Sequence, residues 1–153
     1  MLTAASSTTT NTIKKKNGKR ILLVDDEPDT TMAISIALKS DGYDVYSFNE
    51  PVLAESNFRA DYYDLVILDI KMPIMDGFEL YNKIKKTDSK VNVCFITAID
   101  KSNYKGFEQK KQDIGVRQEK LSEKYCVLNK NMFLQKPISN KDLVTEINKR
   151  MRD

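Results

Sequence analysis

The chain has 153 residues, 41% hydrophobic and 31% charged, with 5 Gly and 4 Pro, a composition typical of one compact globular domain. It contains no histidine, which excludes Ser-His and Cys-His catalysis, His-zinc sites and a phosphohistidine of its own. No apolar run approaches the roughly 18 residues of a membrane span, and no secretory signal precedes the domain. With only 2 Cys, a disulfide framework is not expected. We therefore expect a soluble, cytoplasmic protein without a membrane anchor.

Residues 1–18 are rich in Ser and Thr and then basic, without apolar periodicity, and they predict a disordered leader before a domain at 19–153. The net charge of the chain is +3, but the first 20 residues carry five cations and no acid, so the rest is slightly acidic. The KKKNGKR cluster suits a nuclear-import or nucleic-acid contact, or simply a solvated tail. We favour the solvated tail, because so short a basic run is common.

From Arg20 onward, apolar runs alternate with helical patterns. The first expected helix buries one side and ends at Gly42, a short one begins at Pro51, and a third runs to about Lys86. The last helix begins at a capping box of residues 139–142. The expected buried helical positions are Ala33, Ile34, Ala37, Leu38, Phe78, Leu80, Tyr81, Ile84, Leu143, Ile147 and Met151. The expected strands are 21–24, 43–48, 64–69, 91–97 and 132–135.

Five strands alternating with helices predict an α/β fold with a doubly wound, five-stranded parallel sheet covered on both faces. Such sheets bind ligands beyond the carboxyl ends of their strands. The strand ends are polar here: the first is followed by Asp25 and Asp26, the third and fourth end in Asp69 and Thr97, and the fifth is followed by Lys136. The sequence therefore predicts three carboxylates, a hydroxyl and an amine at one edge of the sheet.

These residues together suggest phosphoryl chemistry. Alone, the acids before Pro28 also suit a helix N-terminus. Together, carboxylates about 5 Å apart repel by about 3 kcal/mol per pair at an effective dielectric near 20, which a cation would relieve. Oxygen ligands on loops suit Mg²⁺, which also bridges to phosphoryl oxygens. One carboxylate could then attack phosphorus, while Lys136 and Thr97 bind the remaining oxygens.

Four motifs in order carry a family resemblance. They are VDDEP (24–28), LDIKMPIMDGFEL (68–80), FITA (95–98) and FLQKPI (133–138). Through them the sequence resembles the receiver domain of two-component response regulators over residues 20–151. The resemblance implies a flavodoxin-like fold of five strand-helix units and a chemotaxis-regulator-like, stand-alone receiver.

The resemblance also implies roles for the acids and their neighbours. Asp69 looks like the phosphoacceptor, and Asp26 like the direct Mg²⁺ ligand. Asp25 would reach the ion chiefly through water, and the backbone carbonyl of Lys71 would be a further ligand. Lys71 and Ile99 occupy positions that border the path of the hydrolytic water in this family, so they would tune the phosphate lifetime. The alternative is that both side chains are exposed and neutral.

The remaining implied residues bind the phosphoryl group or shape the site. Thr97 would move toward the phosphoryl group, Lys136 would pair with it, and Phe133 would rotate inward after the threonine. The bond before Pro137 is expected to be cis. The structural positions of the loop after Asp69 are Met72, Pro73, Met75 and Gly77, and Gly77 is expected to relieve a backbone conformation costly to other residues.

The sequence departs from the family between Thr97 and Phe133, where it is longer by well over ten residues. The segment 101–131 is basic, and Phe107, Ile114 and Leu121 recur every seven residues. This spacing predicts a long helix that lies on the domain or on a partner, or that forms a homodimer. A solvated extension of the fourth helix is the simpler reading. The segment falls on the face formed by the fourth helix, fifth strand and fifth helix, through which the family contacts downstream targets.

The function implied is that of a phosphoacceptor signalling protein rather than an enzyme. Its partners would be a histidine kinase or a histidine phosphotransfer protein, and a downstream protein target, with no DNA-binding domain. Two alternatives stay open. One is a receiver-like binding module that is never phosphorylated. The other is a Mg²⁺-dependent phosphatase with an aspartyl-phosphate intermediate, which would normally carry a second acid where this chain has Lys71.

Overall fold

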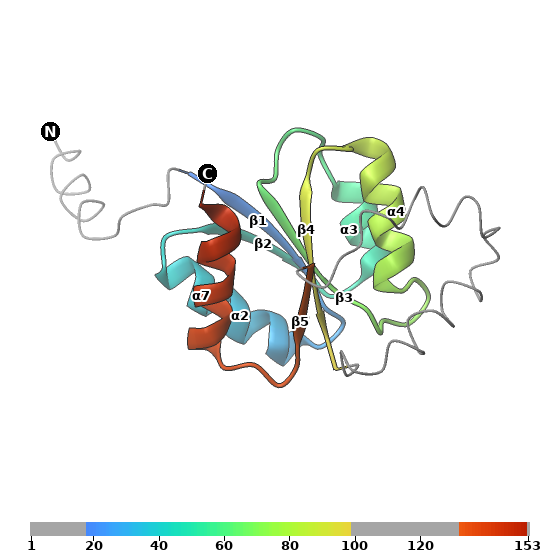
Figure 1. The fold of residues 1–153 in the computed structure, drawn as a ribbon. Coiled ribbons are helices and arrows are strands. Elements are labelled where there is room, and N and C mark those ends of the chain that lie inside the picture. The colour runs from blue at the N-terminus through green and yellow to red at the C-terminus, as the bar shows by residue number, and fades with distance from the viewer. Residues whose placement is uncertain (1–17, 99–131, 153) are drawn as a thin grey trace, which may run out of the picture.

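The computed structural model describes residues 18–98 and 132–152, and these form a sheet with helices on both faces (Figure 1). All five strands are parallel, in the order β2-β1-β3-β4-β5. The strands are β1 (Arg20–Val24), β2 (Asp44–Phe48), β3 (Leu65–Asp69), β4 (Asn92–Thr97) and β5 (Phe133–Gln135). The helices are α2 (Pro28–Ser40), α3 (Pro51–Asn57), α4 (Gly77–Thr87) and α7 (Asn140–Met151). The predicted doubly wound parallel sheet is confirmed.

Side chains alternate across the sheet, which divides the core into two layers. Leu22 of β1 pairs in register with Val66 of β3, and both face the layer covered by α3 and α4. The preceding pair, Ile21 and Leu65, faces the layer covered by α2 and α7 (Figure 1). Every residue of β3 is buried, as expected of a central parallel strand with helices on both faces.

The predicted capping residues Gly42 and Ser139 lie at helix ends, and Asp76 is a further cap that was not predicted. Gly42, with φ of 101°, follows the last turn of α2 in the left-handed conformation that favours glycine. The Asp76 side chain accepts a hydrogen bond from the Glu79 amide at the start of α4. The Ser139 hydroxyl accepts one from the Asp142 amide at the start of α7, which is the first of the two hydrogen bonds of a capping box. The Asp76 and Ser139 caps fix where α4 and α7 begin after the carboxyl ends of β3 and β5, whereas Gly42 ends α2 before β2.

The buried stripe of α2 differs from the predicted one at several positions, and the predicted Ala37 is only half-buried. Ile34 and Leu38 are buried as expected, and Thr31 and Ser35 complete a stripe at helical spacing. Ala33 is exposed, because α2 turns this stripe toward the sheet and α7 and leaves the Ala33 side at the surface. The apolar positions predicted for α4 and α7 are all buried.

Several predictions concern residues outside the described ranges. They are the leader over residues 1–17, Ile99 and the basic segment 101–131 with its Phe107, Ile114 and Leu121 stripe. Cys94 lies within β4 and is buried, and over the described residues it forms no disulfide. Among the described helices, none is both long and apolar enough to cross a membrane.

Candidate functional site

The structure brings three acidic side chains together at the carboxyl edge of the sheet. Asp25 and Asp26 directly follow β1, and Asp69 is the last residue of β3, the strand that pairs with β1. One carboxylate oxygen from each of the three lies within 4.8 Å of the others. Asp25 and Asp69 are buried, and Asp26 is partly exposed. This cluster is open to a ligand on the Asp26 side, and its donors are all oxygens.

Lys136, which follows β5, reaches into the same cluster. Its Nζ lies 2.9 Å from Asp25 Oδ2, to which it donates a hydrogen bond, and 3.7 Å from Asp69 Oδ1. The Lys136 amide donates a 2.7 Å hydrogen bond to the carbonyl of Thr97, the buried last residue of β4. The peptide bond between Lys136 and Pro137 is cis, as the resemblance predicted. The ends of β4 and β5 are therefore tied together where the lysine enters the site.

The electrostatics of the cluster follow from burial and from like charges. Burial, and then the negative charge of Asp25, raise the pKa of the Asp69 carboxyl to about 6, although Lys136 opposes the shift. For Lys136 itself, burial lowers the pKa. The hydrogen bond and charge of Asp25, with the charge of Asp69, outweigh burial, so the pKa of the amine is raised overall. The site thus holds a fixed cation beside a carboxyl group that is costly to ionise.

The two acids after β1 are held differently. Asp25 Oδ1 accepts a hydrogen bond from the Glu27 amide, and its other oxygen binds Lys136. Over the described ranges, the Asp26 carboxylate makes no hydrogen bond and no ion pair. Because ligand bonds need free lone pairs, Asp26 is the better placed of the two for direct contact with a cation.

Asn49 is a positioning residue that the sequence reasoning missed. Its side-chain amide donates to the backbone carbonyl of Asp25 at 2.8 Å and to Thr31 Oγ1 at 2.9 Å, which ties the end of β1 to α2. The Asp25 amide in turn donates to the carbonyl of Phe48 at 3.2 Å. Asn49 directly follows β2. It is therefore a polar residue at the carboxyl end of a strand, the same signal that identifies the site residues at the ends of the other four strands.

Gly77 shapes the loop after Asp69 for a reason other than the predicted one. A Cβ atom at residue 77 would lie 2.2 Å from the carbonyl oxygen of Asp69 and 2.9 Å from the Ile70 Cα. The Gly77 amide donates to the Ile70 carbonyl at 2.9 Å, which holds the two backbones together. The residue therefore supplies space rather than a positive φ. The positive φ in this loop, 73°, belongs to Ile74.

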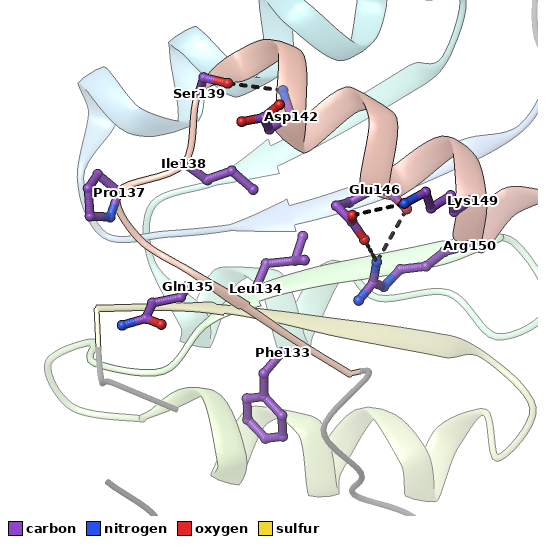
Figure 2. A pocket seen from close by; sticks show the side chains of 10 residues that line it. All are labelled: Phe133, Leu134, Gln135, Pro137, Ile138, Ser139, Asp142, Glu146, Lys149 and Arg150. Atoms are coloured by element: carbon purple, nitrogen blue, oxygen red, sulfur yellow. Dashed lines mark hydrogen bonds and ion pairs between the residues drawn. The ribbon is translucent and has the colours of Figure 1, made fainter. Parts of the chain in front are cut away.

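The other predicted residues lie around this cluster. Phe133 stacks on the buried ring of Phe95, with ring centroids 5.1 Å apart and planes 18° from parallel. Figure 2 shows Phe133 and Leu134 pointing to opposite sides of β5. Lys71 has an exposed side chain two residues after Asp69. The roles predicted for these residues, and for Ile99 outside the described ranges, stay predictions.

A groove runs along β5 and α7 beside the site (Figure 2). On the α7 side, Glu146 pairs with Lys149 at 3.3 Å and with Arg150 at 3.1 Å. On the β5 side, the groove is lined by Phe133, Leu134 and Gln135, and the connection to α7 completes it. The predicted target-binding face consists of the fourth helix, the fifth strand and the fifth helix. The groove includes the last two of these, which are β5 and α7.

Comparison with known proteins identifies related sequences and folds. A family model for the response regulator receiver domain matches residues 21–112. The sensor protein EvgS of Escherichia coli K12 is 36% identical over 79 residues, which cover 52% of this chain and 7% of EvgS. The transcriptional regulatory protein TrcR of Mycobacterium tuberculosis is 36% identical over 77 residues, 50% of this chain and 30% of TrcR. The matches thus span less than a third of either relative.

Solved structures show the same fold. The unphosphorylated receiver domain of HemR from Leptospira biflexa superposes with a TM-score of 0.67 and is 26% identical, covering 88% of this chain and 95% of that domain. The chemotaxis response regulator CheY4 of Vibrio cholerae superposes with a TM-score of 0.63 at 20% identity, covering 86% and 98%. The family model covers more than half of the chain. The chain belongs to the response regulator receiver domain family of two-component systems.

Proposed function

We propose that this receiver accepts a phosphoryl group on Asp69 from a histidine kinase or a histidine phosphotransfer protein. The observation that carries the proposal is the cluster itself: three carboxylates with oxygens within 4.8 Å of one another, and the Lys136 amine 3.7 Å from Asp69. Mutually repelling buried carboxylates reduce stability unless a cation or a ligand uses them. A cytoplasmic location belongs to the same proposal, because ATP, from which kinases take the phosphoryl group, is found there.

The transfer is a substitution at phosphorus. A lone pair on an Asp69 carboxylate oxygen forms the new P–O bond while the P–N bond of the donor phosphohistidine breaks, and that electron pair remains on the imidazole nitrogen. Lys136 already pairs with the carboxylates, so its amine is positioned to bind a phosphoryl oxygen on Asp69. Thr97, buried at the end of β4, would bind another. Transfer would end with a phosphoryl group held by Lys136 and Thr97.

The donor set fits Mg²⁺. Its ligands would be oxygens of Asp26 and Asp69, the Asp25 carboxylate chiefly through water, and the backbone carbonyl of Lys71. When bound, Mg²⁺ neutralises charge on the phosphoryl oxygens and on the acids around them. The unused oxygens of Asp26 support its role as the direct ligand, and the contact of Asp25 with Lys136 supports an outer role for that acid.

A downstream target would recognise a surface whose conformation changes when Asp69 is phosphorylated. The Phe133 ring stacks on Phe95, which also contacts Phe78 and Tyr81 of α4 at centroid distances of 5.2 and 5.4 Å. A movement of Thr97 toward the phosphoryl group would alter the packing of β4 against this aromatic group. The target would bind the adjoining face of β5 and α7, and the Phe107, Ile114 and Leu121 stripe, which lies outside the described residues, would form a homodimer.

Phosphorylation of the wild-type protein by a small phosphodonor is the direct test. Incubation with phosphoramidate and Mg²⁺ should add the mass of one phosphoryl group to the intact protein, because the carboxylate and the metal suffice for transfer. Chelation of divalent metal with EDTA should reduce the addition to background. Addition that is independent of metal, or no addition at all, would reject the proposed function.

Substitution of the two acids after β1 should separate their roles. We expect Asp26→Ala to weaken Mg²⁺ binding by at least about 10- to 100-fold, because it removes a direct ligand and the loss of an outer-shell partner alone has effects of that size. Asp25→Ala should weaken binding less, since it removes a water-mediated contact and also a carboxylate already engaged by Lys136. NMR shifts during Mg²⁺ titration measure both constants, and unfolding in EDTA controls for loss of fold. Equal losses would show that the two acids are not divided into inner and outer ligands.

A further inference from the structure

We propose that Ile74 is a docking contact for the protein phosphodonor, and so a specificity-determining residue for phosphotransfer. The inference rests on the proposed function, because it assumes that a protein donor approaches Asp69. It is based on two features of Ile74, its strained backbone conformation and its exposed side chain. Neither feature is needed for phosphoryl transfer at the acidic cluster.

The backbone around Ile74 forms a strained turn. The Met75 amide donates a 2.8 Å hydrogen bond to the carbonyl of Pro73, and the central residue, Ile74, has φ of 73°. This is a γ-turn of the positive-φ type, which is rare and strained. A β-branched residue is a particularly costly choice there, because its Cβ crowds the backbone at positive φ. Glycine or asparagine would hold the same turn with less strain.

The strained turn is maintained because the residues before and after Ile74 are fixed by packing and by hydrogen bonds. Met72 and Met75 are buried in the core beneath the loop, each 8% exposed. Beyond them, Asp76 caps α4, and Gly77 lies against the backbone of Asp69. Strain of this kind survives only where the surrounding structure determines it. The neighbours of Ile74 therefore fix its position on the surface of the loop.

The Ile74 side chain consequently projects into solvent and is 92% exposed, the largest value among the exposed large hydrophobic residues of the described chain. An isoleucine so exposed gains almost nothing from burial within its own chain. Over the described ranges no side chain covers it, so its apolar surface is available to a binding partner. The strain adds to this argument, because the residue lowers fold stability without packing against the fold.

The position of Ile74 points to the phosphodonor as that contact. It lies five residues after Asp69, in the loop that leaves the same strand end. A donor must bring its phosphorus to within bonding distance of the Asp69 carboxylate, so its surface has to cover the loops at this edge. A downstream target has no such requirement. Ile74 would be buried by the donor in the transfer complex, with an apolar side chain beside the donor histidine as the matching surface.

The test compares a protein donor with a small one. The variants are Ile74→Gly and Ile74→Asn, which both tolerate positive φ and remove the apolar side chain. Leu53→Ala is the matched control, since Leu53 is an apolar residue of α3 that is 47% exposed. The probes are phosphoramidate and a phosphohistidine-bearing phosphotransfer protein that phosphorylates the wild-type chain. We expect kcat/KM with the protein donor to fall about tenfold in both Ile74 variants, which is the effect of a single well-buried contact.

In the same variants the rate with phosphoramidate should stay within about twofold of wild type, and the melting temperature should not fall, because the strain is relieved. The Leu53→Ala protein should match wild type with both donors. Unchanged transfer from the protein donor would overturn the inference. An equal loss with both donors would also overturn it, because Ile74 would then act through site geometry. A wild-type protein that accepts no phosphoryl group from phosphoramidate would instead overturn the proposed function.

Discussion

Replacement of Asp69 by asparagine is expected to abolish phosphorylation and, at the same time, to stabilise the metal-free domain at neutral pH. Phosphorylation stops because the amide has no carboxylate to attack phosphorus. Stability rises because the asparagine keeps the shape of the side chain without its charge. In the wild-type protein that charge is costly, since burial and the neighbouring Asp25 both disfavour it.

The sign of the pH dependence follows from the raised pKa. The folded protein binds the Asp69 proton more tightly, with a pKa of about 6, than the ordinary value of 3.8 expected when unfolded. The contribution of the protonated Asp69 carboxyl to the free energy of unfolding is therefore fully present below about pH 3.8. It is lost as the pH rises to about 6 and beyond. Because the site is partly open to water, we expect the ionised Asp69 carboxylate to lower the free energy of unfolding by about 1–2 kcal/mol at pH 7. This is less than the free energy that corresponds to the whole pKa shift.

Urea unfolding in EDTA from pH 4 to pH 8 measures the difference between the two proteins. The Asn variant should be more stable at pH 7, and the difference should disappear toward pH 4. Asp44→Asn, which removes a carboxylate of β2 outside the cluster, is the control for the loss of one negative charge elsewhere in the fold. Added Mg²⁺ should stabilise the wild-type protein more than the variant. A difference that is the same at pH 4 and pH 7 would contradict the assignment of the cost to the Asp69 charge.

The positions of the site residues were predictable because they depend on short-range patterns. Runs that are apolar on both faces mark central parallel strands, and the polar residue that ends each run must lie at one edge of the sheet. The predicted meeting of Asp25, Asp26, Asp69 and Lys136 follows from that rule alone. Thr97 also lies at this edge, at the end of β4 and bonded through its carbonyl to the Lys136 amide.

Other features were not predictable because they depend on how separate segments approach one another. The hydrogen bonds of Asn49 join β1, β2 and α2, and no pattern within one segment encodes them. The γ-turn at Ile74 contradicts local preference, since a β-branched residue rarely adopts positive φ. Gly77 was recognised as structural, but its reason lies in contact with the Asp69 backbone eight residues earlier. In each case tertiary packing determines the local conformation.

Substitution of Gly77 by alanine is expected to cause the largest loss of fold stability among these variants. Its Cβ would lie 2.2 Å from the Asp69 carbonyl oxygen, far inside van der Waals contact, and neither atom can move away by rotation of a side chain. Helix propensity alone would favour alanine at the start of α4 by up to about 1 kcal/mol. The overlap outweighs this gain, because the start of α4 and the end of β3 must separate. We expect a net loss of about 2–4 kcal/mol.

Gly18→Ala is the matched control, because Gly18 has φ of 68° but no atom within 4 Å of the added Cβ. That substitution carries only the backbone strain, about 1–2 kcal/mol, and no collision. Urea unfolding measures both losses, and phosphoramidate labelling of the folded fraction measures the site. If Gly77→Ala folds, Asp69 moves with its carbonyl, and a displacement of about 1 Å should slow labelling by about 100-fold. A Gly77→Ala protein no less stable than Gly18→Ala, with normal labelling, would mean that β3 and α4 can separate without moving Asp69, and the close approach would not be what positions the phosphoacceptor.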